Sequence, residues 1–188
     1  FLVITEKQRV PAVIVANKLD LVENAKELFG FYEPIGYRVI YTSTRTGVGV
    51  DELHDTLKNK ISALAGPSGA GKSSLLNAIQ PGLGLAVNEI STAMNKGRHT
   101  TVTRQMFPLV GGGYVADTPG WKSLALWDTE AVEMEAYFPE LRDLVQGCQF
   151  SDCTHTHEPN CAVLAAVKDG RVHPERFDSF LRLRAGQE

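Results

Sequence analysis

The sequence has 188 residues, of which 43% are hydrophobic and 22% charged, and its formal net charge is −3. This is the composition of an ordinary globular protein, and no apolar run approaches the roughly 20 residues of a membrane span, so we expect no membrane partner. The acidic balance argues against broad non-specific nucleic-acid binding but leaves room for a local basic patch.

The first part of the chain alternates apolar runs with helical patterns, which favours an α/β fold with a mainly parallel sheet. A continuous apolar run predicts a buried parallel strand at Val10–Ala16, and further strands are expected at Arg38–Thr42 and Ile61–Ala65. Helical patterns occur at Asn24–Phe31, Val50–Lys60 and Ser73–Ile79.

The second part begins with a hairpin pattern, because Thr101–Leu109 and Tyr114–Asp117 flank three consecutive glycines. We expect this antiparallel pair at the edge of the sheet. Short helices are expected beyond Trp127, at Glu130–Tyr137, Glu140–Val145 and Pro174–Arg184. The pattern therefore predicts two domains, residues 1–138 and residues 139–188.

A phosphate-binding loop is predicted directly after the third strand. The eight residues that match G-x-x-x-x-G-K-[ST] are Gly66, Pro67, Ser68, Gly69, Ala70, Gly71, Lys72 and Ser73. Glycines let the backbone wrap around phosphate, and successive N–H groups form an anion site at a helix N-terminus. Lys72 is expected on the β- and γ-phosphates, the Ser73 hydroxyl on Mg²⁺, and Ser74 completes the predicted nucleotide contacts.

The sequence Asn17-Lys18-Leu19-Asp20 follows the first strand and predicts guanine recognition. The Asp20 carboxylate can accept hydrogen bonds from guanine N1–H and the exocyclic amine, whereas adenine would leave it unpaired. Asn17 is expected to brace the loop and contact the base, and the Lys18 stem to lie over the ring. Ser43 could support guanine O6 through its backbone N–H. Alone, the tetrapeptide would often be a helix N-cap that uses Asp20.

Two further motifs suit γ-phosphate sensing. Asp117-Thr118-Pro119-Gly120 ends a predicted strand, so Asp117 can hold Mg²⁺ through a water and the Gly120 N–H can contact the γ-phosphate. The polar segment 85–103 contains Thr100 and Thr101, either of which could complete the magnesium shell.

Position 121 is Trp121, where many GTPases have a glutamine that orients the attacking water. His99 is our candidate for that role, because a neutral imidazole can accept a hydrogen bond from water. The alternative is that His99 contacts only phosphate, RNA or solvent. With either assignment, we expect slow intrinsic hydrolysis that a partner accelerates.

The motif order is circularly permuted, because the guanine motif at Asn17 precedes the phosphate loop at Gly66. The loops are still expected to converge, since each follows a strand of one sheet. The permutation also brings Asp117 close in sequence to the C-terminal segment.

All three cysteines lie in one stretch, Cys148-x4-Cys153-x-His155-x5-Cys161. Three thiolates and one imidazole suit a structural, tetrahedral Zn²⁺ site and a reducing compartment. His157 is a rival fourth ligand. Free thiols in a small core are the alternative to a metal site.

Together, the permuted order, the G-R-H-T-T and D-T-P-G motifs and the Cys/His segment resemble the ribosome small-subunit-dependent GTPase family RsgA, also called YjeQ. The resemblance favours His155 over His157 as the zinc ligand. It implies a monomeric bacterial cytoplasmic GTPase that binds GTP and GDP and acts late in maturation of the 30S ribosomal subunit. It further implies hydrolysis stimulated by that subunit, and a zinc domain that contacts its 16S rRNA.

Members of that family also carry an N-terminal OB-fold domain, to which no part of this sequence corresponds, so the chain is expected to be a fragment. A different function that fits the same motifs is a nucleotide-gated zinc/RNA adaptor with negligible turnover. Basic residues that could contact RNA are Lys96, Arg98, Arg171, Arg176, Arg182 and Arg184.

Overall fold

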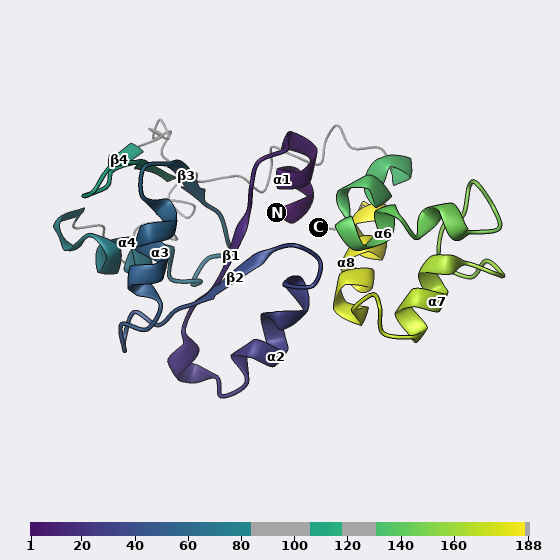
Figure 1. Ribbon diagram of the computed structural model, residues 1–188, viewed down its shortest axis with the longest axis horizontal. Coiled ribbons are helices and arrows are strands. Elements are labelled where there is room, and N and C mark those ends of the chain that lie inside the picture. The colour runs from purple at the N-terminus through teal and green to yellow at the C-terminus, as the bar shows by residue number, and fades with distance from the viewer. Residues whose placement is uncertain (84–105, 118–130, 187–188) are drawn as a thin grey trace, which may run out of the picture. The chain divides into compact units, whose positions relative to one another are not determined.

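A computed structural model describes residues 1–83, 106–117 and 131–186, which fall into two compact units (Figure 1). The sheet unit comprises residues 13–30 and 38–124, and the helical unit comprises residues 1–12, 31–37 and 125–188. The division between the two units does not fall at the domain boundary expected after residue 138. A compact unit is defined by contacts and need not coincide with a domain, so the two predicted domains stay a prediction.

Two strands of the sheet unit, β1 (Val13–Ala16) and β2 (Arg38–Tyr41), pair in parallel. The strand β1 begins three residues later than expected, at Val13 rather than Val10. Proline has no backbone N–H to donate to a strand partner, so Pro11 explains the late start. The strand β1 ends directly before the predicted site residue Asn17, and β2 ends two residues before Ser43.

The remaining described strands of this unit form a second sheet in the order β3-β5-β4. Here β3 (Ile61–Leu64) pairs in parallel with β5 (Tyr114–Asp117), and β4 (Met106–Pro108) pairs antiparallel with β5. The β4–β5 pair is the hairpin expected around the three glycines. The single sheet expected from the sequence is thus two sheets over the described residues.

Helices pack beside the strands of the sheet unit: α2 (Ala25–Phe29), α3 (Val50–Leu57) and α4 (Lys72–Ile79). Single-turn 3₁₀ helices occur at Leu19–Leu21, Gly30–Tyr32 and Pro81–Leu83. One apolar core joins α3 and α4 to the strands and contains Ile40, Leu53, Leu57, Leu75, Leu76, Leu109 and Val115. This core fixes where the loops after β2 and β3 leave the strands.

The helical unit is built from α1 (Leu2–Gln8), α6 (Pro139–Arg142), α7 (Ala162–Lys168) and α8 (Pro174–Arg184). Two 3₁₀ helices, η5 (Ala131–Tyr137) and η6 (Val145–Gly147), flank α6. Its buried residues include Val3, Phe138, Leu141, Val163 and Phe180, together with Cys153 and Cys161. Two of the predicted metal ligands, Cys153 and Cys161, are therefore part of the core of this unit. Among the described helices of the chain, none has the length and apolar character to cross a membrane.

A buried ion pair also lies in the helical unit. The Arg176 guanidinium on α8 donates to both carboxylate oxygens of Glu140 on α6, at 2.6 and 3.2 Å. Only 7% and 4% of these two side chains are exposed. The guanidinium also lies 4.5 Å from the centre of the Phe138 ring, an arrangement in which the ring face attracts the cation. Arg176 is thus used inside the protein and is not free for RNA.

Candidate functional site

The guanine motif forms a tight turn at the end of β1. Lys18 has a φ of 68°, and the Leu19 N–H donates to the Thr42 carbonyl at 3.0 Å. Asp20 lies in the 3₁₀ turn that follows, so the alternative of a cap on an ordinary helix is not what the structure has at this position.

The Asp20 carboxylate is held by the loop that follows β2. Ser43 Oγ donates to Asp20 Oδ1 at 2.5 Å, and Arg45 Nε lies 3.3 Å from Asp20 Oδ2. The Ser43 hydrogen bond is the main cause that lowers the pKa of Asp20 below its usual value, and the cationic groups of Arg45 and Lys18 also lower it. The site therefore presents an ionised carboxylate, which is the form that accepts two hydrogen bonds from a base edge.

Ser43 makes a different contact from the one expected. Its backbone N–H, predicted to support guanine O6, instead donates to the Val48 carbonyl at 2.9 Å. The side chain is fully buried and is directed to Asp20. Ser43 thus contacts the Asp20 carboxylate through its hydroxyl, while its own N–H is used within the loop.

Asn17 connects the guanine motif to two other loops. Its Nδ2 donates to the Ala70 carbonyl at 3.0 Å, and its Oδ1 accepts from Thr42 Oγ1 at 3.1 Å. A Cβ on Gly71, whose φ is 89°, would collide with the Asn17 amide, so only glycine allows this approach. The loops after β1, β2 and β3 therefore converge as predicted, although by side-chain contacts and not within one sheet.

The phosphate-loop residues form a turn that leads into α4. Helix α4 begins at Lys72 with Gly71 as its N-cap residue, and the N–H groups of such a first turn have no partner within the helix. Lys72 Nζ donates to the carbonyls of Gly66 and Pro67 at 2.8 and 3.0 Å. Ser73 is buried at the start of the helix. This combination of open N–H groups and an adjacent ammonium can bind an anion.

Several predicted site residues lie outside the part of the chain that the structure describes: His99, Thr100, Thr101, Gly120 and Trp121, together with Lys96 and Arg98. Asp117 is the last residue of β5, next to Leu64 of β3 in the parallel register. Its strand thus ends beside the strand that leads into the phosphate loop.

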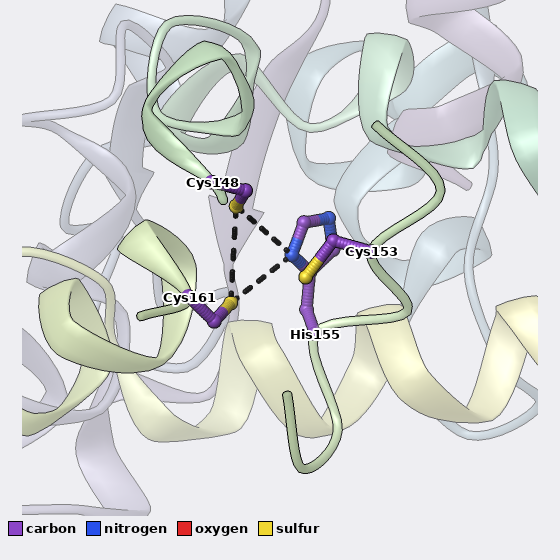
Figure 2. A group of neighbouring side chains, drawn as sticks. All are labelled: Cys148, Cys153, His155 and Cys161. Carbon is purple, nitrogen blue, oxygen red and sulfur yellow. Dashed lines mark hydrogen bonds between the residues drawn. The ribbon is translucent and has the colours of Figure 1, made fainter. Parts of the chain in front are cut away.

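The predicted zinc ligands Cys148, Cys153, His155 and Cys161 lie together in the helical unit (Figure 2), with their ligand atoms all within 4.8 Å of one another. His155 Nδ1 is 3.2 Å from Cys161 Sγ and 3.6 Å from Cys148 Sγ, and the two sulfurs are 3.9 Å apart. A tetrahedral ion with bonds of about 2.0 to 2.3 Å would separate its ligand atoms by roughly 3.5 Å. The donor set therefore fits Zn²⁺ in chemistry and in spacing.

His157, the rival ligand, is exposed and its Nδ1 is 2.8 Å from Thr156 Oγ1, away from the cluster. His155, by contrast, is 1% exposed. Burial raises the pKa of the Cys153 thiol to about 12, and a bound divalent cation would reverse this by stabilising the thiolate.

The loop that carries His155 is organised by Glu158. Its carboxylate accepts from the backbone N–H groups of Thr154, Thr156 and His157, at 2.7 to 3.1 Å, and from the Thr154 hydroxyl. These hydrogen bonds hold His155 in a left-handed conformation with a φ of 60°, which is uncommon for a residue other than glycine.

Sequence reasoning missed Thr42, Arg45 and Glu135, and it named Arg184 only as a possible RNA contact. Thr42 contacts Asn17 and Arg45 contacts Asp20, but neither belongs to a motif. Glu135 and Arg184 lie beside the Cys/His cluster but outside its sequence segment. The sequence gives no spacing rule for such partners, because the fold alone brings them to the ligands.

Comparison with known proteins gives one consistent family. A family model described as RsgA GTPase matches residues 1–127. The small ribosomal subunit biogenesis GTPase RsgA of Gemmatimonas aurantiaca is 50% identical over 186 residues, covering 98% of this chain and 61% of that protein. The protein of the same name from Thermotoga petrophila is 45% identical over 188 residues, with coverage of 97% and 63%.

Two solved structures share the fold. The crystal structure of YjeQ from Thermotoga maritima superposes with a TM-score of 0.76 at 41% identity, covering 99% of this chain and 63% of that one. YloQ, described as a circularly permuted GTPase, gives a TM-score of 0.73 at 32% identity, with coverage of 99% and 60%. The chain thus spans about three fifths of the length of these relatives.

Proposed function

The chain belongs to the RsgA GTPase family, and we propose that it binds GTP and GDP and hydrolyses the β–γ phosphoanhydride of GTP. The observation that carries this proposal is the hydrogen bond from Asn17 to the Ala70 carbonyl. It joins the guanine motif to the phosphate loop, so one nucleotide can contact both.

The base would be selected by Asp20. Its ionised carboxylate would accept from guanine N1–H and the exocyclic amine, while Asn17 braces the loop and the Lys18 stem covers the ring. Adenine has a lone pair at N1 and no amine where guanine has its exocyclic amine, so it would present an acceptor and no donor to the carboxylate. The 2.5 Å hydrogen bond from Ser43 supports this assignment because it keeps the carboxylate ionised and fixed.

The phosphates would lie against the N-terminus of α4. The backbone N–H groups between Gly66 and Ser74 would donate to them, except at Pro67, which has none. Lys72 would exchange its carbonyl partners Gly66 and Pro67 for the β- and γ-phosphate oxygens. Mg²⁺, when bound, neutralises phosphate charge, and Ser73, Asp117 and Thr100 or Thr101 would hold it.

Hydrolysis requires an oriented water molecule, and Trp121 has no group that could hold one. We assign this role to His99, whose neutral imidazole would accept a hydrogen bond from the water. The Gly120 N–H would contact the γ-phosphate and respond to its loss.

We assign one structural zinc ion to Cys148, Cys153, His155 and Cys161, within a small zinc-binding domain. The four residues would fill the tetrahedral shell and leave no position for a substrate. In a segment this small, metal binding would supply much of the folding free energy.

For the whole protein, we propose a role in late maturation of the small (30S) ribosomal subunit, with 16S rRNA as a contact, in the cytoplasm and as a monomer. The names of the relatives support this role. Since the chain spans about three fifths of their length, subunit binding belongs to the full-length protein.

The test is GTP hydrolysis by the full-length protein with and without small subunits. We expect slow basal turnover that rises by roughly 100-fold or more on addition of subunits, the order that a positioned catalytic group gives. A protein that binds the subunit without any rise in turnover would instead be the nucleotide-gated adaptor. His99→Ala should retain GTP binding and lose the stimulated rate.

A further inference from the structure

The two nitrogens of His155 face different partners. Nδ1 points toward the sulfurs of Cys148 and Cys161, whereas Nε2 lies 3.0 Å from Glu135 Oε1. Glu135 therefore lies on the far side of the imidazole from the cluster. Without a rearrangement it cannot be a metal ligand itself.

We propose that Glu135 positions His155 for metal binding by accepting a hydrogen bond from Nε2–H. This inference rests on the zinc site proposed above. A proton fixed on Nε2 leaves the lone pair on Nδ1, the nitrogen that faces the thiolates. The carboxylate also makes the imidazole a stronger electron donor, which is how outer partners commonly raise metal affinity.

The surroundings of Glu135 hold it in this position. It lies on η5, and Arg184 of α8 donates to the same Oε1 at 3.2 Å. The Arg184 guanidinium also lies 3.3 Å from the Thr154 carbonyl, in the loop that carries the histidine. His155 is almost fully buried and Glu135 is 22% exposed, so solvent screens this hydrogen bond little.

One consequence concerns the path of the chain. The element η5 is the first that the structure describes after β5, whose last residue is Asp117. Glu135 therefore ties the Cys/His cluster to η5.

A simpler role for Glu135 would be to hold Arg184 alone. The two roles predict different zinc affinities for the Arg184→Met variant. If Glu135 acts on the imidazole, removing Arg184 leaves the Glu135–His155 hydrogen bond and most of the zinc affinity. If Glu135 serves only to hold Arg184, the two variants lose affinity equally.

The experiment is zinc competition with a chromophoric chelator, on the purified chain and its variants. Glu135→Ala should weaken zinc binding by ~10- to 100-fold, the range seen when outer partners of ligands are removed. Glu135→Gln keeps an acceptor oxygen without the charge, so it should lose less zinc affinity than Glu135→Ala. The matched control is Glu133→Ala, an exposed glutamate on the same 3₁₀ helix. It should bind zinc like the unmodified chain.

Substitution of Co²⁺ for zinc tests whether Glu135 positions His155 without being a metal ligand itself. The Co²⁺ spectrum of Glu135→Gln should keep the bands of a tetrahedral three-sulfur, one-nitrogen site, since Glu135 is not a ligand. Zinc affinity of Glu135→Ala equal to that of the unmodified chain would overturn the proposal, as would an equal loss in Arg184→Met and Glu135→Ala. An unmodified chain that binds no zinc would refute the metal site itself, which is a distinguishable result.

Discussion

The side-chain amide of Asn17 donates a 3.0 Å hydrogen bond to the main-chain carbonyl of Ala70. Residues far apart in sequence, one in the guanine motif and one in the phosphate loop, are thereby placed in one site. The same side chain accepts from Thr42 Oγ1, so three loops depend on it.

Replacing Asn17 by alanine is expected to weaken GTP binding. Two hydrogen bonds are lost, and at about 1 kcal/mol each this corresponds to at least a tenfold rise in Kd. Thr42→Val removes only one of them and should have a smaller effect. Asn24→Ala is the control, because Asn24 is exposed and does not cap α2 with its side chain. Isothermal calorimetry gives the Kd for GTP of all three variants. An unchanged Kd in Asn17→Ala would show that these hydrogen bonds do not contribute to nucleotide binding.

Ser43→Ala is expected to change the pH dependence of GTP binding. The Ser43 hydroxyl lowers the pKa of Asp20, so the carboxylate remains ionised down to a pH below its ordinary pKa. Any stability from this hydrogen bond is present above the unfolded-state pKa, about 3.9, and is lost as the pH falls through the lower folded-state value.

Without the hydroxyl, the pKa of Asp20 rises, and GTP affinity should begin to fall at a higher pH than in the unmodified chain. Titration of GTP affinity from neutral pH downward, with Ser179→Ala as a serine control in the helical unit, checks this. Superimposable pH profiles for the Ser43 variant and the unmodified chain would count against it.

His155→Ala and His157→Ala form a matched pair for the metal site. His155 is buried among three cysteines, whereas His157 is exposed and bonded to Thr156. We expect His155→Ala to lose bound zinc and His157→Ala to retain one equivalent. A chelator should lower the Tm of the unmodified chain and of the His157 variant, because binding stabilises only the folded state. Zinc retained in the His155 variant would be the contrary result.

The ion pair between Arg176 and Glu140 gives a prediction for stability. Both side chains are almost fully buried, so Arg176→Met leaves an unpaired carboxylate and should lower the free energy of unfolding by about 3 kcal/mol or more. Adding Glu140→Gln to that variant removes the charge and should restore part of the loss. Chemical denaturation of the four members of this cycle measures the coupling. Additive losses would mean that the pair contributes little.

Local sequence patterns predicted many of the strands and helices. The apolar runs located β2 and β3, and the helical pattern at Pro174–Arg184 gave both ends of α8. The late start of β1 follows from Pro11, which the sequence displays. The pairing of the strands into two sheets was not predictable, because it depends on tertiary contacts between segments distant in the chain.

The site motifs were found because glycine spacing and ligand spacing are short-range signals. Their supporting residues were not, since Glu135 reaches His155 and Thr42 reaches Asn17 only after folding. Ser43 is the clearest example of a contact that the sequence could not predict. Its place after β2 suggested a backbone contact to the base, but its N–H is taken by Val48 and its hydroxyl by Asp20.

The claim that Asp20 reads guanine is tested most directly by calorimetry with three nucleotides on the unmodified chain and on Asp20→Asn. Xanthine has a carbonyl where guanine has its exocyclic amine, and an asparagine amide can donate to it. The unmodified chain should bind GTP at least ~100-fold more tightly than ATP or XTP, and Asp20→Asn should lose GTP and gain XTP. ATP bound as tightly as GTP by the unmodified chain, or GTP affinity unchanged in Asp20→Asn, would contradict this account.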